Sequence, residues 1–336
     1  MLTLPLAKSL RLSAPSPVQW FIAHVLLHGN FSVFRRVTIH LEGLERVPPA
    51  PVIFALNHTD RFNYFPLQYR LLREHRRYTA SWVKGKYYDH WFLRGFMERI
   101  NSLPAMSRGY LITQDFAAVT GRAPQAQEYR ILRDAVDAAF RGEVHDAPDP
   151  RAVPAAILER PRDIFGLPFD PTAASYTAYI NRIYAEMTTL FVEMNGAALA
   201  KGLDLVVFPE GTRSVRLGPG HIGLAQVALH TRATIVPVGC NGSDLCYPGN
   251  SPFAKPGEIT YRFGEPITYQ ELAPFHPDAP FVPLTGAAER RHAAQFRGVT
   301  HLIMERIAGL LDARHLPEAG SAGAPLQQET AGARSA

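Results

Sequence analysis

Residues 52–66 read VIFALNHTDRFNYFP, and their character changes abruptly after Leu56. The five apolar residues 52–56 have the length of a buried strand and are too few for most helices. The polar residues that follow favour turns and helix N-caps, and from Tyr64 onward the apolar spacing becomes helical. His58 is therefore predicted where a strand gives way to a helix, at the carboxyl edge of a sheet. Open α/β sheets bind ligands at that edge, so His58 is the first candidate functional residue.

A second stretch, LVVFPEGTRS at residues 205–214, repeats this arrangement of a short strand followed by a polar turn. Gly211 would let the backbone approach a ligand closely. The guanidinium of Arg213 matches the geometry of a phosphate, and Thr212 and Ser214 add hydrogen-bond donors. Glu210 is expected either to hold the turn or to bind a substrate hydroxyl. Standing alone, the motif would be read first as a capped turn with a surface arginine.

Strands and helices alternate along the chain, which predicts an α/β fold: a central mostly parallel or mixed sheet flanked by helices. Strands are expected at residues 36–41, 52–56, 78–83, 205–208, 234–238 and 259–263. Helices are expected at residues 64–78, 84–100, 175–201, 222–231 and 287–311. Residues 110–170 are rich in proline and charge and are expected to be an inserted, irregular segment, partly loop, with short helical pieces such as residues 131–140. Residues 1–15 are expected to be loosely ordered.

These patterns predict three parts: an N-terminal amphipathic segment at residues 1–35, one domain at 36–316, and a disordered tail at 317–336. The content of 46% hydrophobic and 19% charged residues excludes general disorder. A net charge of +5 permits contact with anionic lipid, nucleic acid or a phosphorylated substrate without choosing among them. Cys240 and Cys246 fit no common metal or redox spacing and are expected to be small buried hydrophobes in a reducing compartment.

The segment VQWFIAHVLLHGNFSVF at residues 18–34 is amphipathic and rich in residues that suit a membrane interface. It is equally expected to be a docking helix that packs on the core. No apolar run is long enough for a spanning helix, and no signal peptide is predicted. The basic residues near 70–77 could attract lipid, although such a run is more often a solvated helix face. We therefore expect peripheral contact with the cytoplasmic face of a membrane.

The motifs occur in an order that resembles a known family. Asn57-His58, an arginine closing a turn at Arg108, FPEGTRS at 208–214 and IVPV at 235–238 stand as they do in glycerolipid acyltransferases. The sequence is similar to the 1-acylglycerol-3-phosphate (lysophosphatidic acid) acyltransferases from about residue 36 to residue 314. The FPEGTRS run is highly specific, whereas IVPV and the arginine are weak signals by themselves.

The resemblance implies transfer of an acyl group from acyl-CoA or acyl carrier protein to a hydroxyl of a lysophospholipid or glycerol phosphate, in phospholipid biosynthesis. His58 would be the general base that removes the hydroxyl proton. Pro237 would shape the acyl-donor side of the cleft. The acceptor's phosphate would be held by Glu210, Gly211, Thr212 and Arg213, helped by Arg108. The resemblance implies no bound cofactor, no metal and no covalent enzyme intermediate.

The sequence departs from the family beside the histidine. The family has an aspartate five residues after the histidine, where it orients the imidazole and stabilises its protonated form. Here that position is Asn63, and an aspartate stands at Asp60. Either Asp60 supplies the charge through a different turn, or Asn63 suffices, or the enzyme is slow or inactive. The interval between Arg108 and Phe208 is also long, and His221 stands where many relatives have lysine.

Three other functions are weighed against acyl transfer. A catalytically impaired lipid- or acyl-carrier-binding protein on the same fold would bind without turnover, and Asn63 is its main support. A metallohydrolase using His58 and Asp60 is disfavoured, because no second histidine lies at ligand spacing. Nucleic-acid binding rests on the basic pI alone and has no recognised motif, so it is not expected.

Overall fold

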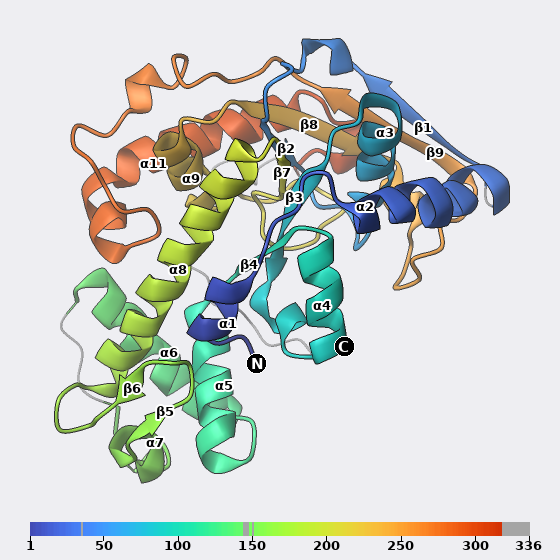
Figure 1. Cartoon of the computed structure of the whole chain (residues 1–336). Helices are drawn as coiled ribbons and strands as arrows, with labels where there is room; N and C mark the ends of the chain where they lie inside the picture. The colour runs from blue at the N-terminus through green and yellow to red at the C-terminus, as the bar shows by residue number, and fades with distance from the viewer. Residues whose placement is uncertain (35, 144–147, 150, 318–336) are drawn as a thin grey trace. The chain divides into compact units, whose positions relative to one another are not determined.

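The computed structural model describes residues 1–34, 36–143, 148–149 and 151–317, and its main feature is a seven-stranded sheet (Figure 1). The strand order is β1-β9-β8-β2-β7-β3-β4. The pairs β1–β9, β2–β8 and β3–β4 are parallel, whereas β8–β9 is antiparallel. The strands are β1 Val37–Glu42, β2 Ile53–Leu56, β3 Thr79–Lys84, β4 Ser102–Ala105, β7 Asp204–Val207, β8 Ile235–Asn241 and β9 Gly257–Phe263. This mixed, mostly parallel sheet with its flanking helices confirms the predicted fold class.

The chain divides into two compact units, and the second contains both candidate motifs. Unit 2 comprises residues 20–78, 206–276 and the described residues from 295 onward. Its strand β2 is buried at all four positions, as expected for a central strand covered on both faces. Around it lies an apolar core to which β1, β8 and β9 contribute Ile39, Val236, Val238, Ile259 and Phe263. The unit also holds α3 Phe65–His75 and α9 Gly223–Thr231.

Unit 1 comprises residues 1–19, 79–205 and 277–294, and it is more regular than the sequence suggested. Helices α5 Arg108–Thr120, α6 Ala126–Arg141 and α8 Tyr176–Ala200 pack on one another (Figure 1). Around them lie α7 Ala155–Glu159 and a small hairpin of β5 Arg162–Asp163 with β6 Pro168–Phe169. The prolines of this region fall between the helices instead of inside them, so a proline-rich composition here does not mean irregular structure.

Two expectations for unit 1 were wrong, one for residues 1–15 and one for the stretch after Ile100. Residues 1–15 include α1 Leu4–Ser9, and Leu2 is completely buried, because the apolar side chains of this segment complete the core. The stretch after Ile100 is not a simple turn but contains β4, and Arg108 is the first residue of α5, capped by the Ser107 hydroxyl.

The N-terminal amphipathic segment forms α2 Pro17–Phe21 and two π-helical segments, η1 Ile22–Leu27 and η2 Gly29–Phe34. Within unit 2, Leu27 and Phe31 are buried in the core, and the ring of His28 bonds to the Tyr69 hydroxyl at 3.0 Å. The opposite side exposes Trp20, Phe21, Val25, Leu26, Val33 and Phe34. One side of the segment thus packs on the core, and the other is an exposed apolar surface. Docking on the core and contact with a membrane interface are therefore compatible interpretations.

The remaining helical segments are η3 Leu44–Arg46, η4 Gly85–Tyr88, α4 Trp91–Arg99, α10 Ser243–Cys246, η5 Ala273–Phe275, α11 Gly286–Ala308, kinked at His292, and η6 Ala313–His315. Among the described residues, none of the helices combines the length and the apolar character needed to cross a bilayer. The predicted disordered tail lies outside the described residues apart from Pro317.

Candidate functional site

The turn that carries His58 is fixed by Asn57, which binds the neighbouring strand. The Asn57 amide nitrogen donates to the Cys240 carbonyl at 3.0 Å, and the Cys240 N–H donates back to the Asn57 side-chain oxygen at 2.7 Å. This pair of buried bonds continues the β2–β8 pairing past Leu56, with a side chain in place of backbone. The bonds of Asn57 to β8 therefore hold His58 at the edge of the sheet, where the strand-to-turn change in the sequence predicted it.

Asn63 is the side chain that the structure places against the His58 ring. Its Oδ1 lies 3.2 Å from Nδ1 of His58, while its Nδ2 donates to the Asn57 carbonyl at 2.8 Å. Because a carbonyl needs a donor, the second bond fixes which amide atom faces the ring. Oδ1 must then accept from Nδ1–H of His58, and Nε2 carries the lone pair that a general base requires. A neutral, completely buried asparagine therefore selects the imidazole tautomer.

Phe208 holds the imidazole from its face and joins the two motifs. Its ring stacks on that of His58 with 4.0 Å between ring centroids and 13° between planes. Phe208 directly follows β7 and opens the FPEGTRS motif. The two strand ends of unit 2 are therefore in contact through their side chains, and the His58 ring is held both by this stacking and by its bond to Asn63.

Asp60, the other candidate for orienting His58, is engaged within its own turn. One carboxylate oxygen accepts the Phe62 N–H at 2.8 Å, and the other accepts the Thr59 hydroxyl at 2.9 Å. Burial raises the pKa of this carboxyl, although these hydrogen bonds act in the opposite direction. Asp60 thus stabilises the turn between His58 and α3, a common role for aspartate at such a position.

Glu210 ties the two motifs together through backbone donors. One carboxylate oxygen accepts the His58 N–H at 2.7 Å, and the other accepts the Gly218 N–H at 2.7 Å. Of the two roles expected for Glu210, this is the turn-holding one. The side chain is buried, and burial raises the pKa of its carboxyl to about 7 in spite of the two bonds.

This raised pKa predicts a stability that depends on pH. A carboxyl whose folded pKa exceeds its unfolded value of 4.5 favours the fold below pH 4.5, and that contribution is lost as the pH rises through about 7. The difference between the two pKa values corresponds to a change of about 3 kcal/mol in the free energy of unfolding across this pH range. In urea unfolding, the free energy of unfolding of wild type should therefore include a decrease between pH 4.5 and about 7 that Glu210→Gln lacks. The exposed Glu258→Gln is the matched control, and equal pH profiles for wild type and Glu210→Gln would contradict the assignment.

The loop that carries Arg213 is anchored to His58 and presents its polar groups to solvent. The Ser214 N–H donates to the His58 carbonyl at 2.8 Å, and Gly211 has φ +65°, a conformation that favours glycine. Gly211, Thr212, Arg213 and Ser214 are all exposed. A cation, two hydroxyls and a glycine thus lie on the loop bonded to the histidine, which is the composition expected of a phosphate site.

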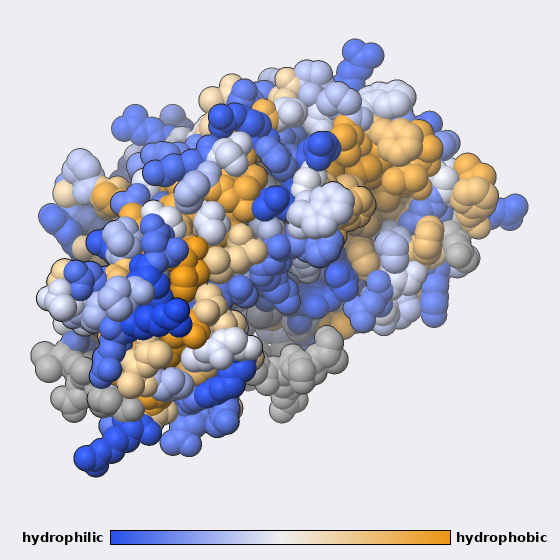
Figure 2. Space-filling view, turned by 60° about the horizontal axis from the view of Figure 1, so that its bottom comes forward, coloured by the Kyte–Doolittle hydropathy of each residue, from blue (hydrophilic) through white to orange (hydrophobic). Residues whose placement is uncertain are grey.

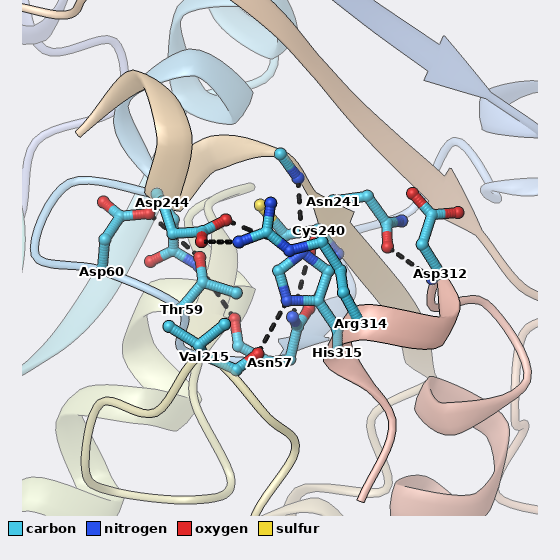
Figure 3. A network of polar contacts seen from close by, with 12 residues as sticks. Asn57, Thr59, Asp60, Val215, Cys240, Asn241, Asp244, Asp312, Arg314 and His315 are labelled. Atoms are coloured by element: carbon cyan, nitrogen blue, oxygen red, sulfur yellow. Dashed lines mark hydrogen bonds and ion pairs between the residues drawn. The ribbon is translucent and has the colours of Figure 1, made fainter. Parts of the chain in front are cut away.

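The far side of this loop is held by a polar network that sequence analysis missed (Figure 3). His315, in η6, is buried, and its Nδ1 lies 2.7 Å from the Val215 carbonyl. Its own carbonyl accepts the Leu217 N–H at 2.8 Å. Asp244 lies beside it, 3.7 Å from Nε2 of His315, and forms an ion pair with Arg314. No local pattern links His315 to residues 100 positions earlier, so no signal in one sequence could have identified this contact.

Arg108 belongs to unit 1, and its guanidinium is already engaged there. It forms an ion pair with Asp137 at 2.5 Å. Its Cζ also lies 3.9 Å from the ring centroid of Phe140 and 4.9 Å from that of Tyr184. Its contribution to phosphate binding stays a prediction. Pro237 is a buried residue of β8, paired in register with Ala55 of β2, and its effect on the acyl donor likewise stays a prediction.

Neither cysteine is engaged in a disulfide, and burial raises the pKa of the thiols of both Cys240 and Cys246, to about 11 for Cys246. Both are buried, as the sequence predicted. In the parts of the chain that the structure describes, no group of three or more His, Cys, Asp or Glu side chains is arranged to hold a metal ion.

Comparison with known proteins supports the resemblance seen in the motifs. No protein-family model matches the chain. Over 77 residues it is 42% identical to a 1-acyl-sn-glycerol-3-phosphate acyltransferase of Cocos nucifera, a match that covers 22% of this chain and 25% of that protein. The similarity thus spans about a quarter of the relative's length. The crystal structure of the 1-acyl-sn-glycerophosphate (LPA) acyltransferase PlsC from Thermotoga maritima is similar with a TM-score of 0.36 and 16% identity, over 85% of this chain and 94% of that one. The sequence match confirms the resemblance to glycerolipid acyltransferases.

Proposed function

We propose that this protein transfers a fatty acyl group from the thioester of acyl-CoA or acyl carrier protein to a hydroxyl of a lysophospholipid or glycerol phosphate. Lysophosphatidic acid is the acceptor that fits best, and the reaction would serve phospholipid biosynthesis. The observation that carries the proposal is the His58 ring, which stacks on Phe208 and whose bond to Asn63 favours the tautomer that a general base needs. The carbonyl of His58 also accepts the Ser214 N–H, which bonds the turn of His58 to the loop that carries Arg213.

The reaction follows from this arrangement of a base beside a cationic loop. Nε2 of His58 takes the proton of the acceptor hydroxyl while that oxygen attacks the thioester carbon. The tetrahedral intermediate collapses by breaking the carbon–sulfur bond, and the thiolate that leaves takes the proton from the imidazolium. The products are an oxygen ester and a free thiol, and His58 returns to its starting state. No covalent enzyme intermediate, metal or bound cofactor takes part in this scheme.

The acceptor's phosphate would be bound by the exposed loop after Phe208. Arg213 supplies the permanent charge, and the Thr212 hydroxyl and the backbone N–H groups supply further donors. Glu210 contributes by holding this loop against His58 through its two backbone bonds. Because the loop and the base share the Ser214–His58 bond, the phosphate would fix the distance between the acceptor hydroxyl and Nε2.

Arg213→Ala is expected to raise the KM for lysophosphatidic acid by about 10- to 100-fold, because it removes charge-assisted hydrogen bonds worth about 1.5–3 kcal/mol. The KM for acyl-CoA should change much less. Arg216→Ala is the matched control, since this neighbouring exposed arginine donates to the Leu316 carbonyl at 3.2 Å. Steady-state kinetics with each substrate varied in turn decides the matter. Equal increases in both KM values would show that Arg213 does not bind the acceptor's phosphate.

Contact with a membrane surface is the natural setting for a lipid acceptor. The exposed face of α2, η1 and η2 combines Trp20 and Phe21 with aliphatic side chains, a composition found in helices that lie in the interface of a bilayer. We therefore propose that the protein is peripheral, on the cytoplasmic face of the membrane. Acyl-CoA or acyl carrier protein would reach it from the aqueous side.

A second function, binding of lipid or acyl carrier without turnover, is favoured by one observation. Asn63 gives the imidazolium no negative charge, so the base is less stabilised when protonated than it would be beside a carboxylate. Radiolabelled acyl-CoA and acyl carrier protein, offered to a panel of lysophospholipids and non-lipid alcohols, separate the two functions. Ester formation supports the transferase, while retention of lysophosphatidic acid with no labelled ester supports the binding protein.

A further inference from the structure

The nine-residue helix α4 of unit 1 exposes the apolar side chains that a helix normally buries. Trp91, Phe92, Leu93 and Phe96 are 72%, 64%, 40% and 39% exposed, and no residue of the helix is buried. Among the described residues, most exposed large hydrophobic side chains belong either to this helix or to residues 20–34. Figure 2 shows that apolar side chains on the face it draws gather into patches bordered by hydrophilic ones.

This exposure is held in place by the rest of unit 1. The Ser16 hydroxyl donates to the Arg99 carbonyl at 2.7 Å, and the Gln19 amide donates to the Ile100 carbonyl at 2.7 Å. Met97 packs on the core of the unit. The helix is therefore anchored by its C-terminal end and by one side, and its aromatic side chains cannot turn inward without breaking these contacts.

The charges around the apolar face are mostly positive. Within α4, Arg99 is exposed and Arg94 is half-buried, and the segment η4 that contacts α4 carries the exposed Lys84, at its N-cap, and Lys86. The two acidic residues nearby are engaged: Asp89 accepts the Tyr110 hydroxyl, and Glu98 accepts the Arg11 N–H at 3.1 Å. An apolar face with tryptophan at its end and a basic border is complementary to an anionic bilayer, where aromatic rings enter the headgroup region and cations meet phosphates.

We propose that α4 is a second lipid-contacting element, whose apolar face enters the headgroup region of an anionic membrane. The choice of lipid over protein rests on the proposed function, which calls for a lipid acceptor. Trp91 and Phe92 supply most of the buried area, and Lys84 and Lys86 supply attraction to anionic headgroups. The membrane would then hold unit 1 directly, in addition to the contact proposed for residues 20–34.

Co-sedimentation of the full chain with phosphatidylcholine vesicles, with and without phosphatidylglycerol, tests this proposal. The double variant Trp91→Ser/Phe92→Ser should bind the anionic vesicles at least about tenfold more weakly than wild type. The matched control is Leu245→Ser/Phe253→Ser, which removes side chains of similar exposure, 61% and 63%, and should bind as wild type does. Lys84→Gln/Lys86→Gln should weaken binding to the anionic vesicles only, and added salt should reduce that difference.

A fluorescence measurement reports on the helix itself. In the variant Trp20→Phe/Trp82→Phe the remaining tryptophan is Trp91, whose emission should shift to shorter wavelength on vesicles and be quenched by brominated lipid. His58→Ala should bind vesicles like wild type, so failure of the catalytic proposal and failure of this one are distinguishable. Unchanged binding by Trp91→Ser/Phe92→Ser would overturn the proposal. So would a wild-type dimer that this variant converts to monomer, which would assign the face to a second copy of the chain.

Discussion

His58→Ala is expected to lower the rate of acyl transfer by about 10³-fold or more, because it removes the base proposed for the acceptor hydroxyl. The fold should survive the change. The bonds that join His58 to Glu210 and Ser214 use its backbone N–H and carbonyl, which alanine retains. The change removes the stacking of the half-buried ring on Phe208 and its bond to Asn63 Oδ1, while the backbone bonds of the turn remain.

Initial rates with saturating acyl-CoA and lysophosphatidic acid measure this effect, and far-UV circular dichroism checks the fold. His40→Ala, at an exposed position of β1, is the matched control and should retain the wild-type rate. An unchanged rate for a well-folded His58→Ala would mean that the general base lies elsewhere.

Asn63→Ala is expected to lower kcat by about 10²-fold or more, since the imidazole then loses the acceptor that fixes its tautomer. The KM values should change less, because Asn63 is buried and is not one of the exposed residues proposed to bind the phosphate. The variant should also be less stable, because the buried Asn57 carbonyl loses the Asn63 amide as its donor.

Asp60→Asn is the control for this prediction, since it keeps the shape of the side chain and an acceptor for the Phe62 N–H. It should leave kcat within a few-fold of wild type. The reverse pattern, with a large loss for Asp60→Asn and none for Asn63→Ala, would show that Asp60 orients the ring during catalysis through a turn different from the one in this structure.

The strand-to-turn changes at His58 and at Pro209 were predictable because they depend on local patterns of apolar and polar residues. That the two turns meet was predictable as well, since parallel strands of one sheet end at the same edge. Which of Asp60 and Asn63 faces the ring was not. That choice depends on the path of the turn, in which Asp60 caps the Phe62 N–H and Asn63 returns beneath His58.

Long-range contacts account for the rest of what the sequence could not reveal. Glu210 was expected at the turn, but its bond to the His58 N–H joins residues 152 positions apart. The network of His315 and Asp244 has no local signature at all. In residues 110–170, the high proline content concealed α5 and the full extent of α6, of which only residues 131–140 were predicted, because the prolines lie between the helices.

The role proposed for His58 is that of an acyl-transfer base presented by the buried, neutral Asn63 and the stacked Phe208. It is tested most directly by incubating the protein with radiolabelled acyl-CoA and lysophosphatidic acid and measuring labelled phosphatidic acid. We expect labelled phosphatidic acid with wild type, about 10²-fold less with Asn63→Ala, and background levels with His58→Ala. Equal amounts of product from wild type and His58→Ala, or binding of lysophosphatidic acid by wild type with no labelled ester from either acyl donor, would contradict it.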